Sequence, residues 1–158
     1  MYELVRRVRA ATDLPLLAKL TPNTADVVGL ARSVEAGGAD CISMINTVKA
    51  MAIDIRTRRP VLGNISGGLS GPAIKPIALY QIWEVFEVVD IPIIGMGGAT
   101  DYRDVLEFIL AGARAVALGT VNLVDPSAAP RILEDLGRYL EENGIDDINA
   151  LVGAAHRT

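Results

Sequence analysis

Two neighbouring glycine-rich turns offer the clearest potential for chemistry in this sequence. Gly97 and Gly98 follow one short apolar run. Gly119 and Thr120 follow the next apolar run along the chain. Glycine lets the backbone approach an anion closely, free N–H groups donate to its oxygens, and the threonine hydroxyl adds another donor. The pattern predicts a phosphate-binding site if the two turns lie side by side, and the alternative is that these glycines only shape tight turns.

Three polar residues take corresponding places in the first part of the chain. Lys19 lies near the end of the apolar run 14–20, and Asn46 and Thr47 follow the next apolar run. An unpaired ammonium is costly in a buried strand, so Lys19 either reaches a carboxylate such as Asp26 or offers a fixed positive charge to an anionic ligand. Asn46 and Thr47 either cap a turn or hydrogen-bond the amide and carboxylate groups of a ligand.

The elements that must position these residues occur as a repeat. Residues 14–47 and 91–120 both read as strand, helix, strand, with Leu14 matching Ile91. The strands are short apolar runs without polar alternation, which is typical of parallel strands buried on both faces. The duplication predicts four parallel strands joined by right-handed connections. The predicted fold class is α/β, as a half barrel of the (β/α)8 TIM-barrel type, since a whole barrel needs about 250 residues. A small open doubly wound sheet is the alternative.

The remaining segments complete this plan. Residues 52–64 predict a β-hairpin inserted between the repeats, and residues 65–71 predict a Gly/Ser loop. Thr24 is expected to cap a helix that ends at Glu35, and His156 is expected to lie in an exposed tail. Further helices are expected at 3–11, from Pro72 to about Val89, at 128–142 and at 146–155.

Composition restricts the class of protein. The chain has 158 residues, 51% of them hydrophobic and 22% charged, with a net charge of −4. These values predict a single α/β domain over residues 1–158 that does not bind nucleic acid. The single cysteine, Cys41, excludes an internal disulfide, suits a cytoplasmic protein and is expected to be an inert thiol. No cluster of His, Cys or Asp has metal-ligand spacing, no Ser-His-Asp set is placed for catalysis, and no apolar run approaches the roughly 18 residues of a membrane span.

Four motifs carry a resemblance to a known family: A-K-L-T-P-N, S-G-G-L-S-G-P-A-I-K-P-I-A-L, I-P-I-I-G-M-G-G and A-V-A-L-G-T. In this order they resemble the C-terminal half of dihydroorotate dehydrogenase, the flavin enzyme of pyrimidine biosynthesis. The run R-R-P-V-L-G-N-I-S-G-G-L-S-G is most similar to the NAD-linked class 1B catalytic subunit. The resemblance covers essentially the whole chain. Dihydropyrimidine dehydrogenase, which shares a related S-G-T-A-I-R-P-I-A-L pattern, is the nearest alternative.

The resemblance implies FMN as the cofactor and dihydroorotate or orotate as the ligand. Asn46 and Thr47 match positions that bind the substrate. The positions that match FMN contacts are Lys19 at the ring, Ile45 and Gly71 along the cofactor, and, largely at the phosphate, Gly97, Gly98, Gly119 and Thr120. The implied reaction transfers a hydride from the dihydropyrimidine ring to FMN while a base removes the neighbouring proton. A lysine near the ring can stabilise the anionic reduced flavin.

The catalytic base of the family is not matched in this sequence. It is a cysteine on a loop of the N-terminal half, and Cys41 does not occupy its place. The resemblance therefore implies a fragment with no catalytic residue of its own, inactive alone, whose parent passes electrons to NAD through a partner subunit carrying FAD and an iron–sulfur cluster. A second hypothesis is a non-catalytic FMN- or phosphate-binding half barrel that forms a homo-oligomer through open strand edges at 14–20 and 115–118. A third is a β/α-barrel enzyme that acts on another phosphorylated ligand.

Overall fold

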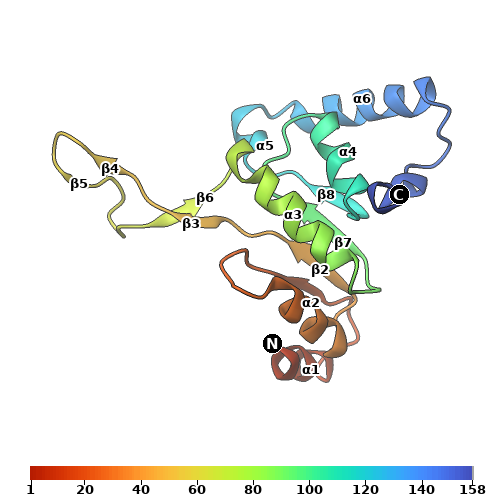
Figure 1. The fold of residues 1–158 in the computed structure, drawn as a ribbon, viewed down its shortest axis with the longest axis horizontal. Helices are drawn as coiled ribbons and strands as arrows, with labels where there is room; N and C mark the ends of the chain where they lie inside the picture. The colour runs from red at the N-terminus through yellow and green to blue at the C-terminus, as the bar shows by residue number, and fades with distance from the viewer. Residues whose placement is uncertain (158) are drawn as a thin grey trace.

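The structure, a computed structural model, describes residues 1–157 (Figure 1). Four parallel strands form the central sheet in the order β1-β2-β7-β8. Their bounds are Leu17–Lys19 for β1, Cys41–Met44 for β2, Ile93–Met96 for β7 and Ala115–Ala117 for β8. Helix α2 (Val27–Ala36) joins β1 to β2, and helix α4 (Tyr102–Leu110) joins β7 to β8. The repeated strand-helix-strand unit predicted from the sequence is therefore confirmed.

The other helices surround this repeat. Helix α1 (Tyr2–Arg9) packs against α2, and α3 (Lys75–Phe86) follows the 3-10 turn η1 (Pro72–Ile74) between the two units. The remaining helical elements are α5 (Val121–Val124), α6 (Ala128–Glu142), η2 (Ile148–Leu151) and η3 (Ala154–His156). Helix α5 was not expected. The single helix expected at 146–155 is wrong, because Gly153 has a left-handed φ of +66° and separates η2 from η3. Within residues 1–157 no helix combines the length and the apolar character needed to cross a membrane.

One face of the sheet forms the hydrophobic core. Ile42 and Met44 of β2 and Ile93 of β7 are at most 1% exposed and belong to one cluster with the inner faces of the helices. Gly95 of β7 makes room for a helix side chain, because a Cβ there would lie 2.9 Å from the ring of Phe108. Gly95 therefore belongs to the strand rather than to the glycine-rich turn that follows it.

The opposite face of the sheet is open at its edges. The strand register places Lys19, Ser43, Ile94 and Ala115 in one row across this face. Leu17, which points to the same side as Lys19, is 51% exposed. The expectation that every strand is buried on both faces is wrong for β1 and β8, because Leu17 and Lys19 of β1 and Ala115 of β8 are exposed on this face. A parallel sheet with one such open face is what half of a barrel presents.

Side chains set the start of two elements differently from the prediction. Asp26, not Thr24, caps α2, because Asp26 Oδ1 accepts a hydrogen bond from the Gly29 N–H at 2.6 Å. Strand β1 is shorter than the apolar run that predicted it. Leu14, the first residue expected in this strand, lies outside β1. Its carbonyl oxygen accepts a hydrogen bond from Arg9 Nη2 at 2.6 Å instead.

The segment between the repeats forms an antiparallel arm. Strand β3 (Val48–Ala50) pairs with β6 (Gly67–Leu69), and β4 (Ile53–Asp54) pairs with β5 (Arg59–Pro60) nearer the tip. The predicted hairpin is thus the outer part of the arm, and part of the predicted Gly/Ser loop is strand β6. The arm, residues 48–69, projects away from the rest of the molecule in Figure 1, and none of its residues is buried.

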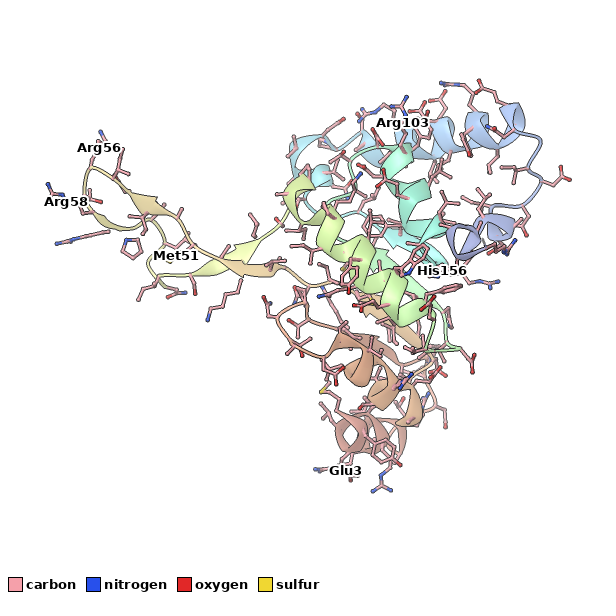
Figure 2. All side chains as sticks on the ribbon, viewed as in Figure 1. Glu3, Met51, Arg56, Arg58, Arg103 and His156 are labelled. Carbon is pink, nitrogen blue, oxygen red and sulfur yellow. The ribbon has the colours of Figure 1, made fainter. Side chains whose placement is uncertain are left out.

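The C-terminal segment is docked on α3. The His156 ring stacks on Trp83 with ring centroids 3.5 Å apart, and its Nε2 lies 3.1 Å from the Ala111 carbonyl oxygen (Figure 2). Phe86 lies so close to Gly153 that no Cβ would fit there. The expectation that His156 lies in an exposed tail is therefore wrong, because contacts with distant residues hold it.

Candidate functional site

A cavity lies where the carboxyl ends of the parallel strands meet. It has a volume of about 300 Å³, at the lower end of the range for small-molecule sites. Its lining includes every residue that the sequence predicted as a site: Lys19, Ile45, Asn46, Thr47, Gly71, Gly97, Gly98, Gly119 and Thr120. The structure therefore brings these residues together, and their individual roles stay predictions.

The turn after β7 requires glycine for two reasons. Gly97 and Gly98 have φ angles of +130° and +89°, which residues with a Cβ rarely adopt. A Cβ on Gly98 would also lie 2.7 Å from the Gly71 carbonyl oxygen and 3.0 Å from the Lys75 backbone nitrogen. Gly71, which precedes η1, itself has a φ of +86°. Two glycine-rich loops thus meet backbone to backbone beside the cavity.

The two turns predicted to bind phosphate leave backbone donors free. Within residues 1–157, the N–H groups of Gly98, Gly119 and Thr120 donate no hydrogen bond to another part of the chain. Thr120 Oγ1 donates to Ser70 Oγ at 2.9 Å, which joins the turn after β8 to the loop after β6. Free N–H groups gathered at one site suit an anionic oxygen.

Ser70 is a cavity residue that sequence reasoning missed. Its place next to Gly71 in the S-G-G-L-S-G run was the available signal, because a hydroxyl beside an anion-binding turn is a further polar contact. The other missed lining residues are apolar or small, and no local pattern marks them: Ile74, Met96, Ala117 and Leu118.

Among residues 1–157, Lys19 is the only charged residue that lines the cavity. It is exposed rather than buried, and the alternative of an ion pair with Asp26 is not seen, since Asp26 caps α2 instead. In the part of the chain that the structure describes, Lys19 forms no ion pair with any carboxylate. The cavity therefore carries a positive charge without a compensating negative one, which favours an anionic ligand.

Asn46 and Thr47 are exposed at the end of β2. Asn46 Oδ1 accepts a hydrogen bond from the Thr47 N–H at 2.8 Å, so the carbonyl end of this amide shapes the turn. The Asn23 amide fixes the same loop, because it donates to the Thr47 carbonyl oxygen at 3.0 Å and accepts from the Lys49 N–H at 2.8 Å. The turn-capping alternative is thus realised by Asn46 Oδ1, and the Asn46 NH2 group is left for other partners.

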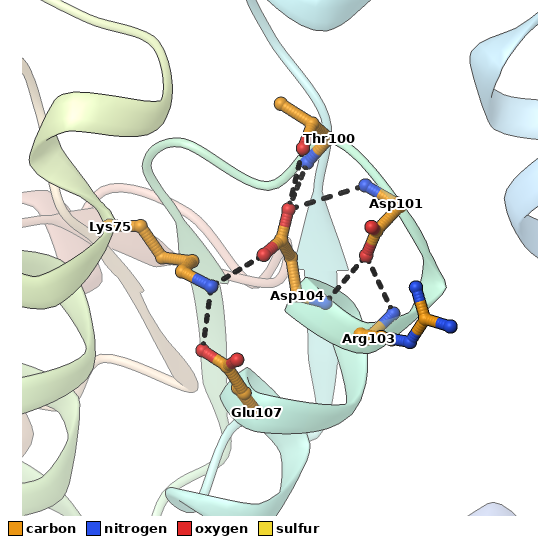
Figure 3. Close-up of polar contacts among 6 residues, drawn as sticks. All are labelled: Lys75, Thr100, Asp101, Arg103, Asp104 and Glu107. Carbon is orange, nitrogen blue, oxygen red and sulfur yellow. Dashed lines mark hydrogen bonds and ion pairs between the residues drawn. The ribbon is translucent and has the colours of Figure 1, made fainter.

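A partly buried ion-pair cluster lies beside the glycine-rich turn after β7 (Figure 3). Lys75 Nζ donates to Asp104 Oδ1 at 2.5 Å and to Glu107 Oε2 at 2.8 Å. Burial alone would raise the pKa of Asp104, but hydrogen bonds from Lys75 and Thr100 outweigh burial and hold this pKa below its usual value. Hydrogen bonds to the Asp104 and Glu107 carboxylates raise the pKa of Lys75. Sequence reasoning missed this cluster, whose one local signal is the T-D-x-x-D run at 100–104.

Parallel strands, connecting helices and a cavity at the carboxyl ends of the strands define a protein of the β/α-barrel class, present here as a half barrel. The predicted fold class is therefore confirmed. The chain belongs to the dihydroorotate dehydrogenase family, whose family model matches residues 1–140. This match confirms the resemblance that the motifs indicated.

Relatives in two bacteria are matched by this chain over part of their length. The chain is 57% identical over 155 residues to the dihydroorotate dehydrogenase B (NAD(+)) catalytic subunit of Desulforudis audaxviator, covering 98% of this chain and 50% of that protein. It is 56% identical over 154 residues to the protein of the same description from Desulforamulus reducens, covering 98% of this chain and 51% of that protein. The chain therefore spans about half the length of the curated relatives it matches.

A solved structure agrees with these matches. The crystal structure of DHODH from Eimeria tenella in complex with ferulenol has a TM-score of 0.74 to this chain at 26% sequence identity. The similarity covers 90% of this chain and 39% of that one. The half barrel thus corresponds to part of a larger enzyme fold.

Proposed function

We propose that the chain supplies the C-terminal half of the flavin and substrate sites of an NAD-linked dihydroorotate dehydrogenase, which oxidises dihydroorotate to orotate in pyrimidine biosynthesis. One observation carries the proposal. In a chain of this family, the predicted residues line one cavity that holds a single positive charge and free backbone donors. The cofactor that we propose for this cavity is FMN.

The residues present fit a flavin mononucleotide. Gly98, Gly119 and Thr120 offer backbone N–H donors that would hold the phosphate, and the Ser70 hydroxyl, which accepts from Thr120 Oγ1, keeps its own proton to donate. Ile45 and Met96 give the cavity an apolar side, which suits a ring system. When bound, FMN supplies an acceptor for the hydride that leaves the substrate.

The polar residues of the cavity have roles that suit their chemistry. Lys19 keeps a fixed positive charge where negative charge accumulates as electrons arrive, so it favours reduction electrostatically. Asn46 and Thr47 orient the substrate through hydrogen bonds to its amide and carboxylate groups. Gly71 lets the loop after β6 pass close to the ligand, because a Cβ would narrow the cavity.

The cavity lining contains no group suited to remove the substrate's proton. Of the residues that the structure describes, those that line it include no carboxylate, histidine or cysteine. Cys41 begins β2, at the opposite end of that strand from the cavity, and burial raises the pKa of its thiol, which disfavours the reactive thiolate. We therefore expect the chain alone to bind its ligands without turnover.

We further propose the partners and location of the parent enzyme. A subunit with FAD and an iron–sulfur cluster would pass the electrons to NAD, and both subunits would act in the cytoplasm. A homo-oligomer is supported by the arm, on which Met51, Ile53 and Ile55 are 51%, 61% and 88% exposed. Arg56 and Arg58 at the arm tip (Figure 2) are part of a basic arm on a chain of net charge −4, so the arm of one copy complements the body of another.

A non-catalytic FMN-binding half barrel is the second candidate function. The missing base in the cavity and the open strand edges favour it. The two candidates differ in one property: an enzyme half binds orotate beside FMN, whereas a half barrel without a substrate site binds FMN only.

Flavin titration tests both candidates. The purified chain, shown to be folded by circular dichroism, is added to FMN while the flavin fluorescence is followed. We expect saturable quenching at one FMN per chain, weakened by Lys19→Met and Thr120→Val. Lys49→Met on the arm is the matched control and should leave the affinity unchanged. A folded chain that binds no FMN contradicts both candidates, and FMN binding without a spectral response to orotate favours the second.

A further inference from the structure

Asp104 is the only buried residue with a charged side chain in the part of the chain that the structure describes. Its carboxylate accepts hydrogen bonds from Thr100 N and Thr100 Oγ1 at 2.7 Å each and from Lys75 Nζ at 2.5 Å. It also accepts one from the Asp101 N–H at 3.3 Å. A buried carboxylate is tolerated when it is paired and hydrogen-bonded in this way. These donors show that Asp104 connects the start of α3 with the turn that precedes α4.

Helix capping explains only part of this arrangement. Asp101 caps α4, since its Oδ1 accepts from the N–H groups of Arg103 and Asp104 at 2.8 Å and 3.1 Å. A capping box also needs the Asp104 carboxylate to accept a hydrogen bond from the Asp101 N–H. At 3.3 Å this is the longest hydrogen bond that the Asp104 carboxylate accepts. The shorter contacts go to Thr100 and Lys75. Asp104 therefore binds the turn before α4 and the first residue of α3, in addition to completing the capping box.

The ion pair lies beside the point where the two glycine-rich loops meet. A Cβ on Gly98 would lie 2.7 Å from the Gly71 carbonyl oxygen, 3.0 Å from Lys75 N and 3.1 Å from Lys75 Cβ. The backbone of Lys75 thus touches the Gly98 turn directly. Its ammonium is held by Asp104, which in turn holds Thr100 at the end of the same turn. The turn is thus held at both ends: Gly98 lies against Lys75, Lys75 binds Asp104, and Asp104 binds Thr100.

The geometry does not make Lys75 a phosphate contact. Lys75 does not line the cavity, and two carboxylates of α4, Asp104 and Glu107, compensate its charge (Figure 3). A lysine that follows a glycine-rich loop is otherwise an obvious partner for a phosphate. Here its charge serves to join α3 to α4, and the donors that face the cavity come from the backbone.

We propose that Asp104 and Lys75 are positioning residues for the anionic end of the cavity. Their ion pair holds the Gly71 loop against the Gly98 turn and so keeps the Gly98 N–H directed at a phosphate oxygen. The proposal rests on the proposed flavin-phosphate site and adds a pair that touches no ligand. Asp104→Asn keeps the shape of the side chain but loses the charge that holds Lys75, so the turn should lose order while the core remains.

The ratio of riboflavin to FMN dissociation constants tests this role, because the two ligands differ only in the phosphate. We expect Asp104→Asn and Lys75→Met to weaken FMN binding about tenfold, the effect of one misplaced phosphate hydrogen bond, and to leave riboflavin binding within about twofold. Asp125→Asn is the matched control, since Asp125 also accepts from a cation, Arg131 at 2.6 Å, but its partners, Ser127 and Arg131, lie outside the Gly71 loop and the Gly98 turn. It should change neither constant.

Amide hydrogen exchange supplies a readout without ligand. Exchange at residues 71–75 and 97–101 should accelerate together in both variants and stay unchanged in the Asp125→Asn control. Equal weakening of both ligands, or unchanged FMN affinity and exchange in a folded Asp104→Asn chain, would overturn the positioning role. A wild type that does not prefer FMN over riboflavin would overturn the proposed phosphate site itself.

Discussion

Replacement of Gly98 by alanine tests how closely the two glycine-rich loops approach each other. The new Cβ would lie 2.7 Å from the Gly71 carbonyl oxygen and 3.0 Å from Lys75 N, and both are backbone atoms that cannot rotate away. The φ of +89° adds strain of about 1–2 kcal/mol for a residue with a Cβ. Overpacking typically adds about 1–3 kcal/mol. We therefore expect Gly98→Ala to lower the free energy of unfolding by about 2–5 kcal/mol.

Urea unfolding followed by circular dichroism measures this change. Gly119→Ala is the matched control, because a Cβ there would meet no atom within 4 Å and the φ of Gly119 is not positive. Its stability should stay within about 0.5 kcal/mol of the wild type. A Gly98→Ala chain as stable as the Gly119→Ala chain would contradict the backbone contact and the cavity geometry that depends on it.

Further predictions concern stability, pH and assembly. Gly137 lies inside α6, where an added Cβ would meet no atom within 4 Å, so Gly137→Ala should raise the free energy of unfolding by about 0.5–1 kcal/mol, and a lower urea midpoint would contradict this. His156→Ala removes the stack on Trp83 and should lower the free energy of unfolding by about 0.5–1.5 kcal/mol, seen as a lower midpoint of thermal denaturation. An unchanged midpoint would mean that the C-terminal segment does not pack on α3. The pKa of Asp104 lies below its usual value in the folded chain, so its stabilisation is present above about pH 4 and is lost as pH falls through the folded pKa. The stability difference between wild type and Asp104→Asn should therefore shrink in acid, and a constant difference would refute the pairing. Ile55→Asp on the arm should shift the oligomer toward monomer in light scattering, and an unaltered mass would exclude the arm from the contact.

The strand-helix-strand repeat could be predicted because its information is local. Short apolar runs that end in glycine or in polar residues mark strands, and the segments between them carry helical periodicity. The cavity followed from topology, since parallel strands end at the same edge of a sheet. Lys19 from one outer strand and Thr120 from beyond the other therefore line the same space, although they lie far apart in the sequence.

The features that could not be predicted depend on contacts between distant residues. Lys75 and Asp104 lie 29 positions apart, and no local pattern pairs them. His156 reaches the carbonyl oxygen of Ala111, 45 positions away, and no local pattern in the short C-terminal segment indicates that it packs on α3. The exposed inner side of β1 was missed for a related reason: an apolar run indicates a strand but does not show whether a second layer covers it.

The turns after β7 and β8 are central to the proposed site, and amide chemical shifts test them most directly. The isotope-labelled chain is titrated with FMN and, separately, with riboflavin. We predict that FMN shifts the amide signals of Gly98, Gly119 and Thr120 and that riboflavin leaves these three signals unchanged. Equal shifts with both ligands, or FMN shifts confined to the arm, would contradict a phosphate site at these turns.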